Sequence, residues 1–570
     1  MYTHPLTKKI ITAAMSVMMI ASAVPAVKTH SASSALKGDI NTDGETNSVD
    51  LSVMSLYLAG RADISIQGFM NGDLDGDGVI DSLDLIQMRK LVIDDREQKA
   101  ATAAIASRLV KLQAARNNSS ASLLAAPPNW ADPDFANTSD NISKSADDEF
   151  IKPAVGSMNG SLPSQGNGRV CIFYTDFPDC RYSYEFSANE ISNIAFADED
   201  RSSKFYPHES INGFFMRSSK YCMNLSGEVY RYTAKHNKEY YENDNCKVKL
   251  IDEILENMDE SVDFTKFDGN GDNILDAMLI SVPEAAGNEN WWPNAGQYAG
   301  AADKTADGKK PGYVVIGNAE LKIDDRCNFV ASYIHELAHC MGLPDYYIYG
   351  EPNSEGLHGS AGYDTMDKLY SDFSCVSKLM LGWYTGGQVE RFIYNGYDEQ
   401  TFTLTDGQSI NGNCVIIPYK NKLADDYCSE FLILEYTSLR GNNSDIPQKY
   451  RWQNYGSGIR IFHVDASKEI KPDSVAFLYR SGNDEATNDD QGRRFIRVVK
   501  DLNIDNLFRA GSCIDNAVSG FAFYDEEGQE TVEPFVSISV GEFVGDSYTV
   551  TISKKGDPNG KNIIQLIRKF

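Results

Sequence analysis

The chain has 570 residues, of which 42% are hydrophobic and 11% aromatic, so it is long enough for three or four folded units with apolar cores. Its 81 acidic side chains outnumber the 53 basic ones, which gives a formal charge of -28. Nucleic acids and anionic membranes bind positive surfaces, so this charge argues against both as partners. An excess of acidic side chains is instead compatible with calcium binding.

The first 26 residues have the features of a secretory signal. Lys8 and Lys9 precede an apolar run that ends at Ala21, and small residues follow at Ala23 and Ala26. The run is too short for a stable membrane anchor, and no later apolar run approaches membrane length. We therefore expect an exported protein with a signal peptide at 1–26 and no membrane span.

An internal repeat follows, with GDINTDGETNSVDL at 38–51 and GDLDGDGVIDSLDL at 72–85. Each copy has oxygen ligands at positions 1, 3, 5, 9 and 12 of a calcium loop, glycine at position 6, and a backbone carbonyl at position 7. The predicted calcium ligands are Asp39, Asn41, Asp43, Glu45, Asn47 and Asp50 in the first loop, and Asp73, Asp75, Asp77, Val79, Asp81 and Asp84 in the second. An acidic, turn-rich linker is the alternative. Because the spacing occurs twice, two bound calcium ions are the better interpretation.

Each loop is followed by a segment with apolar residues at helical spacing, LSVMSLYLAG and LIQMRKLVI, whereas no amphipathic helix leads into the first loop. Such paired half EF-hands resemble a dockerin, the module that binds the cohesin domains of cellulosomal scaffoldins. The resemblance covers residues 36–96 and implies a small all-α domain with a cohesin partner. It also implies that the cohesin is contacted by Ser48, Val49, Ser82, Leu83, Arg89 and Lys90.

The next segment, 97–167, is Ala-rich at first and then rich in Pro, Ser and Asn. This composition predicts a helix followed by a flexible linker. A linker of this kind would let an anchored enzyme reach its substrate.

Strands and helices are predicted to alternate from 169 to 341, which favours an α/β sheet. KVKLIDEILENM at 247–258 has the apolar spacing of a helix, and GYVVIGNAEL at 312–321 predicts a strand. Between them, the acidic stretch at 263–280 contains a third calcium-like loop without an acidic residue at position 12. A solvated turn is the alternative to calcium here. The predicted ligands are Asp268, Asn270, Asp272, Ile274 and Asp276.

The stretch IHELAHCMGLPD at 334–345 places two histidines one helical turn apart. With Asn328 as the expected N-cap and Gly342 ending the helix, His335 and His339 share one side and can bind a single zinc ion. We expect the Asp345 carboxylate to be the third ligand, with His358 as its rival. Glu336 is then the expected catalytic base, because it can take a proton from water activated by the metal. Two helix histidines without a metal are the alternative.

The run HELAHCMGLPDYY resembles the signature of the immune inhibitor A family, which are secreted, metzincin-like zinc metallopeptidases. Further segments resemble elements of that family: RVCIFYTDFPD at 169–179, GYDTMD at 362–367 and SKLMLGW at 377–383. The resemblance implies a metzincin-like α/β zinc protease domain, here at 168–385, with Met366 in a Met-turn beneath the zinc. An edge strand next to the cleft could bind an extended peptide through main-chain hydrogen bonds.

After Trp383 the sequence changes to short segments of alternating polarity, from TFTLT at 401–405 to SYTVTIS at 547–553. These predict an all-β, sandwich-like domain at 386–555, followed by a tail at 556–570. His463 lies in one of these strands, where a hydrogen-bonded structural histidine is the expected role. The expected fold class is therefore a multidomain α+β protein with an all-α dockerin, an α/β protease domain and an all-β domain.

The sequence predicts a secreted zinc endopeptidase that hydrolyses protein or peptide substrates and attaches through its dockerin to a cohesin-bearing scaffoldin. One zinc ion, two calcium ions in the dockerin and a possible third calcium are the expected cofactors. The alternative is a calcium-dependent component of the same complex that binds protein or glycan without cutting it. A carbohydrate-cleaving enzyme would need paired carboxylates in a sugar cleft, and the sequence shows no signature of them.

Overall fold

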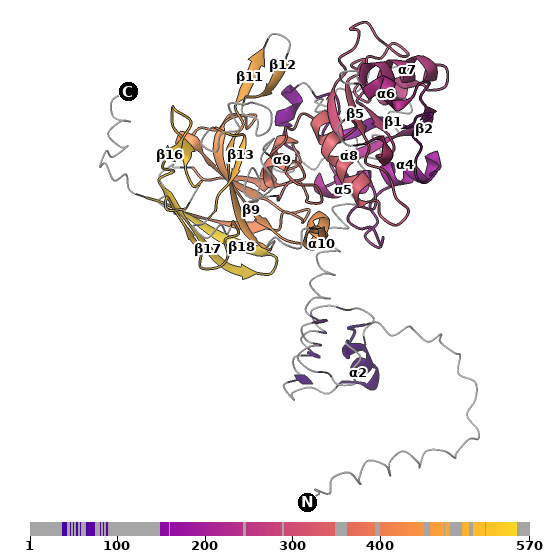
Figure 1. Ribbon diagram of the computed structural model, residues 1–570. Coiled ribbons are helices and arrows are strands. Elements are labelled where there is room, and N and C mark those ends of the chain that lie inside the picture. The colour runs from indigo at the N-terminus through magenta and orange to yellow at the C-terminus, as the bar shows by residue number, and fades with distance from the viewer. Residues whose placement is uncertain are drawn as a thin grey trace, which may run out of the picture. The chain divides into compact units, whose positions relative to one another are not determined.

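The computed structural model divides into two compact units, Met1–Thr102 and Ala103–Phe570, which are described separately (Figure 1). The predicted signal peptide and tail lie outside the described residues, as does 97–148. The residues that the structure describes are 37–42, 46, 50, 53–54, 57–58, 64–74, 80, 84, 87–88, 149–158, 160–242, 247–287, 290–347, 362–393, 399–449, 456–471, 474–478, 493–500, 506–518 and 520–555.

The first unit has a core that reflects the sequence repeat. Ile40 and Leu74 occupy equivalent positions of the two copies, as do Met54 and Met88, and all four are buried in one cluster. Helix α2 (Ile66–Gly72) leads into the second loop, and its N-cap Ser65 accepts a hydrogen bond from the Gly68 N–H. The two repeats therefore share one apolar core.

The second unit begins with a five-stranded sheet of order β2-β1-β3-β5-β4. Four of its strands run parallel, and the edge strand β4 pairs antiparallel with β5. The strands are β1 (Gly166–Asp176), β2 (Met223–Thr233), β3 (Ala277–Ser281), β4 (Asn294–Gln297) and β5 (Tyr313–Gly317).

Helices cover both faces of this sheet, because alternate residues of each strand point to opposite sides. Val170 and Ile172 of β1 belong to a core that includes residues of α4, α5 and α8, whereas Cys171 and Phe173 belong to a core that includes α7. The α/β arrangement expected for 169–341 is thus present. The helices are α4 (Ala188–Phe196), α5 (Ile211–Ser218), α6 (Lys238–Glu242), α7 (Val248–Met258), α8 (Cys327–Cys340) and α9 (Cys375–Met380).

The segment 149–167, which the sequence assigned to the linker, instead packs against the rest of the unit. Ala154, Val155 and Leu162 are buried in the core that contains α8. The Trp383 indole N–H donates to the Ser164 carbonyl at 2.8 Å. The linker prediction was therefore wrong for these residues, since a few apolar side chains among the prolines and serines suffice to anchor them.

The C-terminal part contains two larger sheets, of order β13-β10-β9-β8-β6 and β14-β17-β18-β7. Leu432 and Leu434 of β9 share a core with Ile538 of β17 and Val550 of β18, so the two sheets pack face to face. The strands of these sheets are β6 (Val389–Arg391), β7 (Glu399–Thr405), β8 (Cys414–Pro418), β9 (Glu430–Thr437), β10 (Gly458–Asp465), β13 (Ile496–Val498), β14 (Cys513–Ile514), β17 (Val536–Val544) and β18 (Ser547–Lys554).

The first of these sheets is buried on both faces. Phe431 and Ile433 of β9 point away from the second sheet and enter the core that contains α8. The α/β and all-β parts therefore share one core, and the whole chain is a multidomain α+β protein. Two small hairpins, β11 (Lys468–Lys471) with β12 (Ser474–Phe477) and β15 (Phe523–Tyr524) with β16 (Glu530–Val532), complete the strands.

The remaining described elements are short. None of the helices in the described ranges combines the length and the apolarity that crossing a bilayer requires. These short elements are α10 (Ile446–Lys449) and the 3₁₀ turns η3 (Ala154–Ser157), η5 (Phe264–Phe267), η6 (Glu284–Ala286), η7 (Gly386–Gln388), η8 (Tyr419–Asn421) and η9 (Gly441–Asn443).

Candidate active site

Helix α8 carries the two histidines on one face, as their spacing predicts. The helix begins at Cys327 with Arg326 at the N-cap, so the expected N-cap at Asn328 was wrong by two residues. The Asp325 carboxylate accepts a hydrogen bond from the Cys327 N–H at this end. At the other end, Gly342 has φ +107°, a conformation that side-chain-bearing residues rarely adopt. This turn reverses the chain and brings Asp345 back to the helix.

The three predicted zinc ligands converge. His335 Nε2 lies 3.1 Å from His339 Nε2, and the Asp345 Oδ1 atom lies 2.9 Å from the first nitrogen and 3.2 Å from the second. Ligand atoms around a tetrahedral zinc ion with ordinary bond lengths lie roughly 3.3–3.4 Å apart. The side chains therefore match a zinc site to within a few tenths of an ångström.

Backbone carbonyls fix the orientation of both imidazole rings. His335 Nδ1 donates to the Thr365 carbonyl at 2.8 Å, and His339 Nδ1 donates to the Leu343 carbonyl at 2.7 Å. Carbonyls only accept, so each ring carries a proton on Nδ1 and turns Nε2 toward Asp345. Electron-rich atoms this close together repel one another unless a positive charge lies among them. The donor set thus fits a divalent cation such as zinc.

The pKa values of His335 and Asp345 are both shifted toward their charged forms. Burial disfavours the charged form of His335, but the hydrogen bond to Asp345 and the charge of Glu336 raise its pKa to about 9. Burial would raise the pKa of Asp345, but hydrogen bonds from His335 and His339 lower it below its usual range.

Glu336 lies on the same helix and is 6% exposed. Burial raises the pKa of its carboxyl, and the nearby His335 and His339 oppose that rise. A carboxylate shielded from solvent beside the ligand cluster can exchange protons with a bound substrate or with water.

The predicted Met-turn lies against the histidines. Thr365, whose carbonyl binds His335, directly precedes the buried Met366, and the Met366 carbonyl accepts from the Tyr346 N–H at 2.8 Å. Asp364 stabilises this turn, because its carboxylate accepts hydrogen bonds from the Met366 N–H and the Ser374 hydroxyl. The position of Met366 beneath the zinc stays a prediction of the family resemblance.

Sequence reasoning did not find the Thr365 and Leu343 carbonyls. A backbone oxygen carries no residue-type signal, so only the Gly342 turn gave any indication of the second. The two tyrosines that follow Asp345 differ in their contacts. Tyr347 stacks on His335 with ring centroids 6.3 Å apart, whereas the buried Tyr346 shares a hydrogen bond with Ser377. The rival ligand His358 lies outside the described residues.

Edge strand β4 lies next to helix α8, which carries His335 and His339. Both β4 and β5 contact α8, and three of the four residues of β4 are exposed. Among the strands that the structure describes, β4 has a neighbour on one side only. Its other edge offers main-chain groups to which an extended peptide can pair.

The third calcium-like loop is held by internal hydrogen bonds. Asp268 accepts from the Gly271 and Asp272 N–H groups and forms a 2.7 Å ion pair with Lys309. Asp276 accepts from the Gly269 and Arg169 N–H groups. The Lys309 ammonium supplies positive charge to this loop, and calcium there stays a prediction. The described residues include the whole predicted set, but its carboxylates do not form a group of three ligand atoms within 4.8 Å of one another.

The last acidic residue of each loop in the first unit bonds to the backbone near the start of the same loop. Asp50 and Asp84, both at position 12, are buried and fold back to the start of their loops. Asp50 accepts from the Asn41 N–H at 3.1 Å, and Asp84 accepts from the Leu74 N–H at 2.8 Å. Other predicted calcium and cohesin contacts lie outside the described residues, namely Asp43, Glu45, Asn47, Ser48, Val49, Asp75, Asp77, Val79, Asp81, Ser82, Leu83, Arg89 and Lys90.

Comparison with known families agrees with this unit. Residues 37–93 match the dockerin type I domain, which confirms the predicted dockerin. No curated protein matches the chain. Dockerin type I domains bind calcium and the cohesin domains of scaffoldins, and proteins that carry them are typically extracellular. The domain implies attachment to a cohesin-bearing scaffold in a cellulosome-like complex.

Proposed function

We propose that this protein is a secreted zinc endopeptidase of the immune inhibitor A type, which its dockerin attaches to a cohesin-bearing scaffold. The convergence of His335 Nε2, His339 Nε2 and Asp345 Oδ1, with both Nδ1 atoms bound by backbone carbonyls, carries this proposal. The dockerin would hold two calcium ions in the loops 39–50 and 73–84.

The three ligands would hold zinc and leave a coordination position open for substrate or water, as in other catalytic zinc sites. When bound, zinc polarises a carbonyl and lowers the pKa of water. Glu336 is the general base: it takes a proton from the attacking water and passes it to the leaving amine. Its burial and its electrostatic interaction with His335 and His339 support this role.

A peptide is the substrate that the surroundings favour. An extended chain paired to the free edge of β4 would run beside α8, because β4 packs against that helix. Main-chain pairing orients the scissile bond without demanding a particular sequence. Selectivity would then come from pockets for the side chains.

The test is casein hydrolysis by the full chain with Glu336→Gln. We expect hydrolysis to fall by about 10²–10⁴-fold, since a general base contributes this much, while the zinc content stays at the wild-type level. Glu239→Gln is the matched control, because Glu239 is an exposed glutamate of α6. Zinc-loaded wild-type protein that leaves casein intact would instead support the non-catalytic binding component. Wild-type hydrolysis by Glu336→Gln would disprove the role of Glu336.

A further inference from the structure

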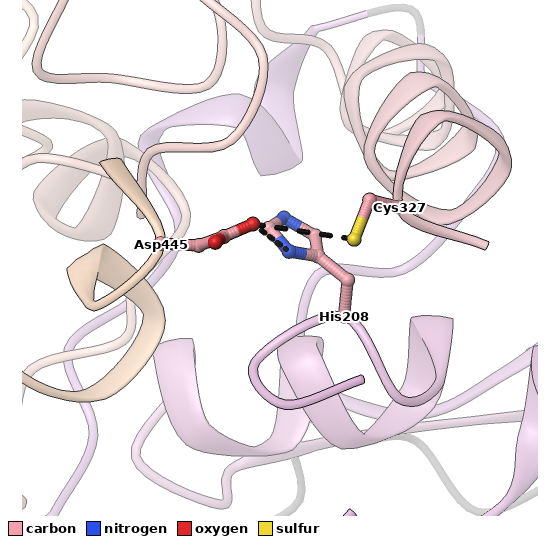
Figure 2. Close-up of side chains that lie close together, drawn as sticks. All are labelled: His208, Cys327 and Asp445. Carbon is pink, nitrogen blue, oxygen red and sulfur yellow. Dashed lines mark hydrogen bonds and ion pairs between the residues drawn. The ribbon is translucent and has the colours of Figure 1, made fainter. Parts of the chain in front are cut away.

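A second cluster of metal-ligating side chains lies at the opposite end of α8 (Figure 2). Cys327 is the first residue of that helix, His208 precedes α5, and Asp445 precedes α10. The Asp445 Oδ2 atom lies 3.7 Å from His208 Nδ1 and 4.0 Å from Cys327 Sγ. Three distant segments of the second unit thus bring an imidazole, a thiol and a carboxylate together.

The imidazole of His208 is buried without hydrogen bonds in the part of the chain that the structure describes, which indicates a binding partner such as a metal ion. Its side chain is 1% exposed, and among the described residues neither ring nitrogen has a hydrogen-bond partner. Buried polar atoms without partners are rare because they lose their hydrogen bonds to water. Burial lowers the pKa of His208 to about 3, so the ring is neutral and offers a lone pair, which is the form that binds metals.

The distances suit a metal ion at the centre of the cluster. From ordinary zinc bond lengths and tetrahedral angles, the oxygen of one ligand lies roughly 3.4 Å from a nitrogen ligand and 3.6 Å from a sulfur ligand. The observed separations of 3.7 and 4.0 Å exceed these by only a few tenths of an ångström. The ligand atoms of His208 and Cys327 lie within 4.8 Å of each other, so side-chain shifts would bring all three around one ion.

Charges of both signs surround the cluster: the carboxylates of Asp325 and Asp445, and the cations Lys449 and Arg217. Burial raises the pKa of Cys327 to about 11; Lys449 opposes this rise, whereas the carboxylates of Asp325 and Asp445 add to it. A cysteine that stays a thiol at neutral pH is a poor nucleophile, which argues against a cysteine-histidine catalytic pair. A bound cation removes the thiol proton and balances the acidic groups.

We propose that His208, Cys327 and Asp445 bind one zinc ion or a similar divalent transition metal, with water in the fourth position, and that this ion links three separate segments of the chain. The site goes beyond the proposed peptidase function, because Cys327 lies eight residues before His335, about 12 Å along the helix. It joins the start of α8 to the connection between β9 and β10. The Cys327 N–H already donates to the Asp325 carboxylate, so the ion would add a link from this end of the helix to the segments that carry His208 and Asp445.

Cobalt tests this site separately from the peptidase centre, because only this one contains a thiolate. Full-length protein is produced in cobalt-supplemented medium, and its near-ultraviolet sulfur-to-cobalt charge-transfer band is recorded. We expect the band in wild-type protein, its loss in Cys327→Ser, and its retention in Cys513→Ser, a control at an exposed thiol. Excess zinc should remove the band by displacing the cobalt.

Absence of the band from cobalt-loaded wild-type protein would overturn the proposal, as would its persistence in Cys327→Ser. Should Cys327→Ser fail to fold, His208→Gln and Asp445→Asn provide the decision. Each should lower the affinity for cobalt, measured by the band, by more than about tenfold, which is the smallest loss typical of an outer-shell contact. An unchanged affinity in both variants would exclude these residues as ligands.

Discussion

The two ends of α8 carry histidine clusters that differ in how the rings are held. At the C-terminal end, His335 and His339 each donate from Nδ1 to a backbone carbonyl. At the N-terminal end, neither nitrogen of His208 has a hydrogen-bond partner among the described residues. The first cluster is preorganised before any ion arrives, whereas the second depends on an ion to satisfy its imidazole.

This difference suits different roles. Catalysis requires ligands that keep their geometry while substrate and water exchange, and outer-shell hydrogen bonds provide that geometry. A structural ion only has to stay bound, so its ligands can come from separate segments and be ordered by the metal itself. The proposed peptidase chemistry therefore belongs to the C-terminal end of α8, and the proposed second ion would hold its N-terminal end in place.

The largest expected effect comes from breaking the preorganised cluster at Asp345. Asp345→Asn keeps the shape of the side chain but removes the charge, so we expect zinc affinity to fall by more than about 100-fold, beyond the range of outer-shell contacts, and hydrolysis to be lost. Zinc titration with a competing chelator measures the affinity.

His358→Gln is the matched variant for this prediction, because His358 is the rival third ligand. It should bind zinc as the wild type does. Should His358→Gln lose zinc while Asp345→Asn keeps it, the third ligand has been misassigned.

Removing calcium extends the comparison to the first unit. That unit has a small core and buries the Asp39, Asp50 and Asp84 carboxylates, so we expect its folding to depend on the ion, whereas the larger core of the second unit should persist. Limited proteolysis of the full chain in a calcium chelator, with zinc resupplied, should cleave within 37–93 first. Equal protection of that region with and without calcium would contradict the expectation.

His463 is a further buried histidine, and its substitution should have a smaller effect than the changes above. His463 is bonded at Nδ1 by Glu530, 2.7 Å away, and at Nε2 by Glu430, 2.9 Å away. Burial opposes the charged form, but these two carboxylates raise the pKa of His463. Because both nitrogens are satisfied, we expect His463→Gln to leave the metal content unchanged and to lower the free energy of unfolding by about 3–5 kcal/mol.

The sign of the pH dependence follows from the raised pKa. The stabilisation by the His463 charge is complete below the unfolded-state pKa of about 6.5 and is lost as the pH rises through the higher folded-state pKa. The stability difference between wild type and His463→Gln should therefore be largest below about pH 6.5. Chemical denaturation across pH measures it, and a difference that grows with rising pH would contradict the assignment.

Sequence predicted the cluster at the C-terminal end of α8 because its parts lie within one short segment. Helical spacing places His335 and His339, and a glycine turn returns Asp345. Cys327 and Asp445 are 118 residues apart, and no local pattern connects them. The ion pair between Lys309 and Asp268 was not predicted for the same reason, because the two residues lie in separate segments of the chain.

Much of the fold was also predictable from periodicity. The apolar spacing of 247–258 predicted α7, and alternation predicted β9 and β10. Periodicity could not predict that the alternate faces of β9 join two different cores, because burial on the second face depends on which domain packs there. The packed segment 149–167 was missed because its composition resembles a linker.

X-ray diffraction at the zinc absorption edge, on crystals grown with zinc, tests the central claim most directly. We expect an anomalous difference peak between His335 Nε2, His339 Nε2 and Asp345 Oδ1, at about 2.0–2.2 Å from each. No peak there under saturating zinc, or side chains turned away from one another, would contradict the proposed peptidase.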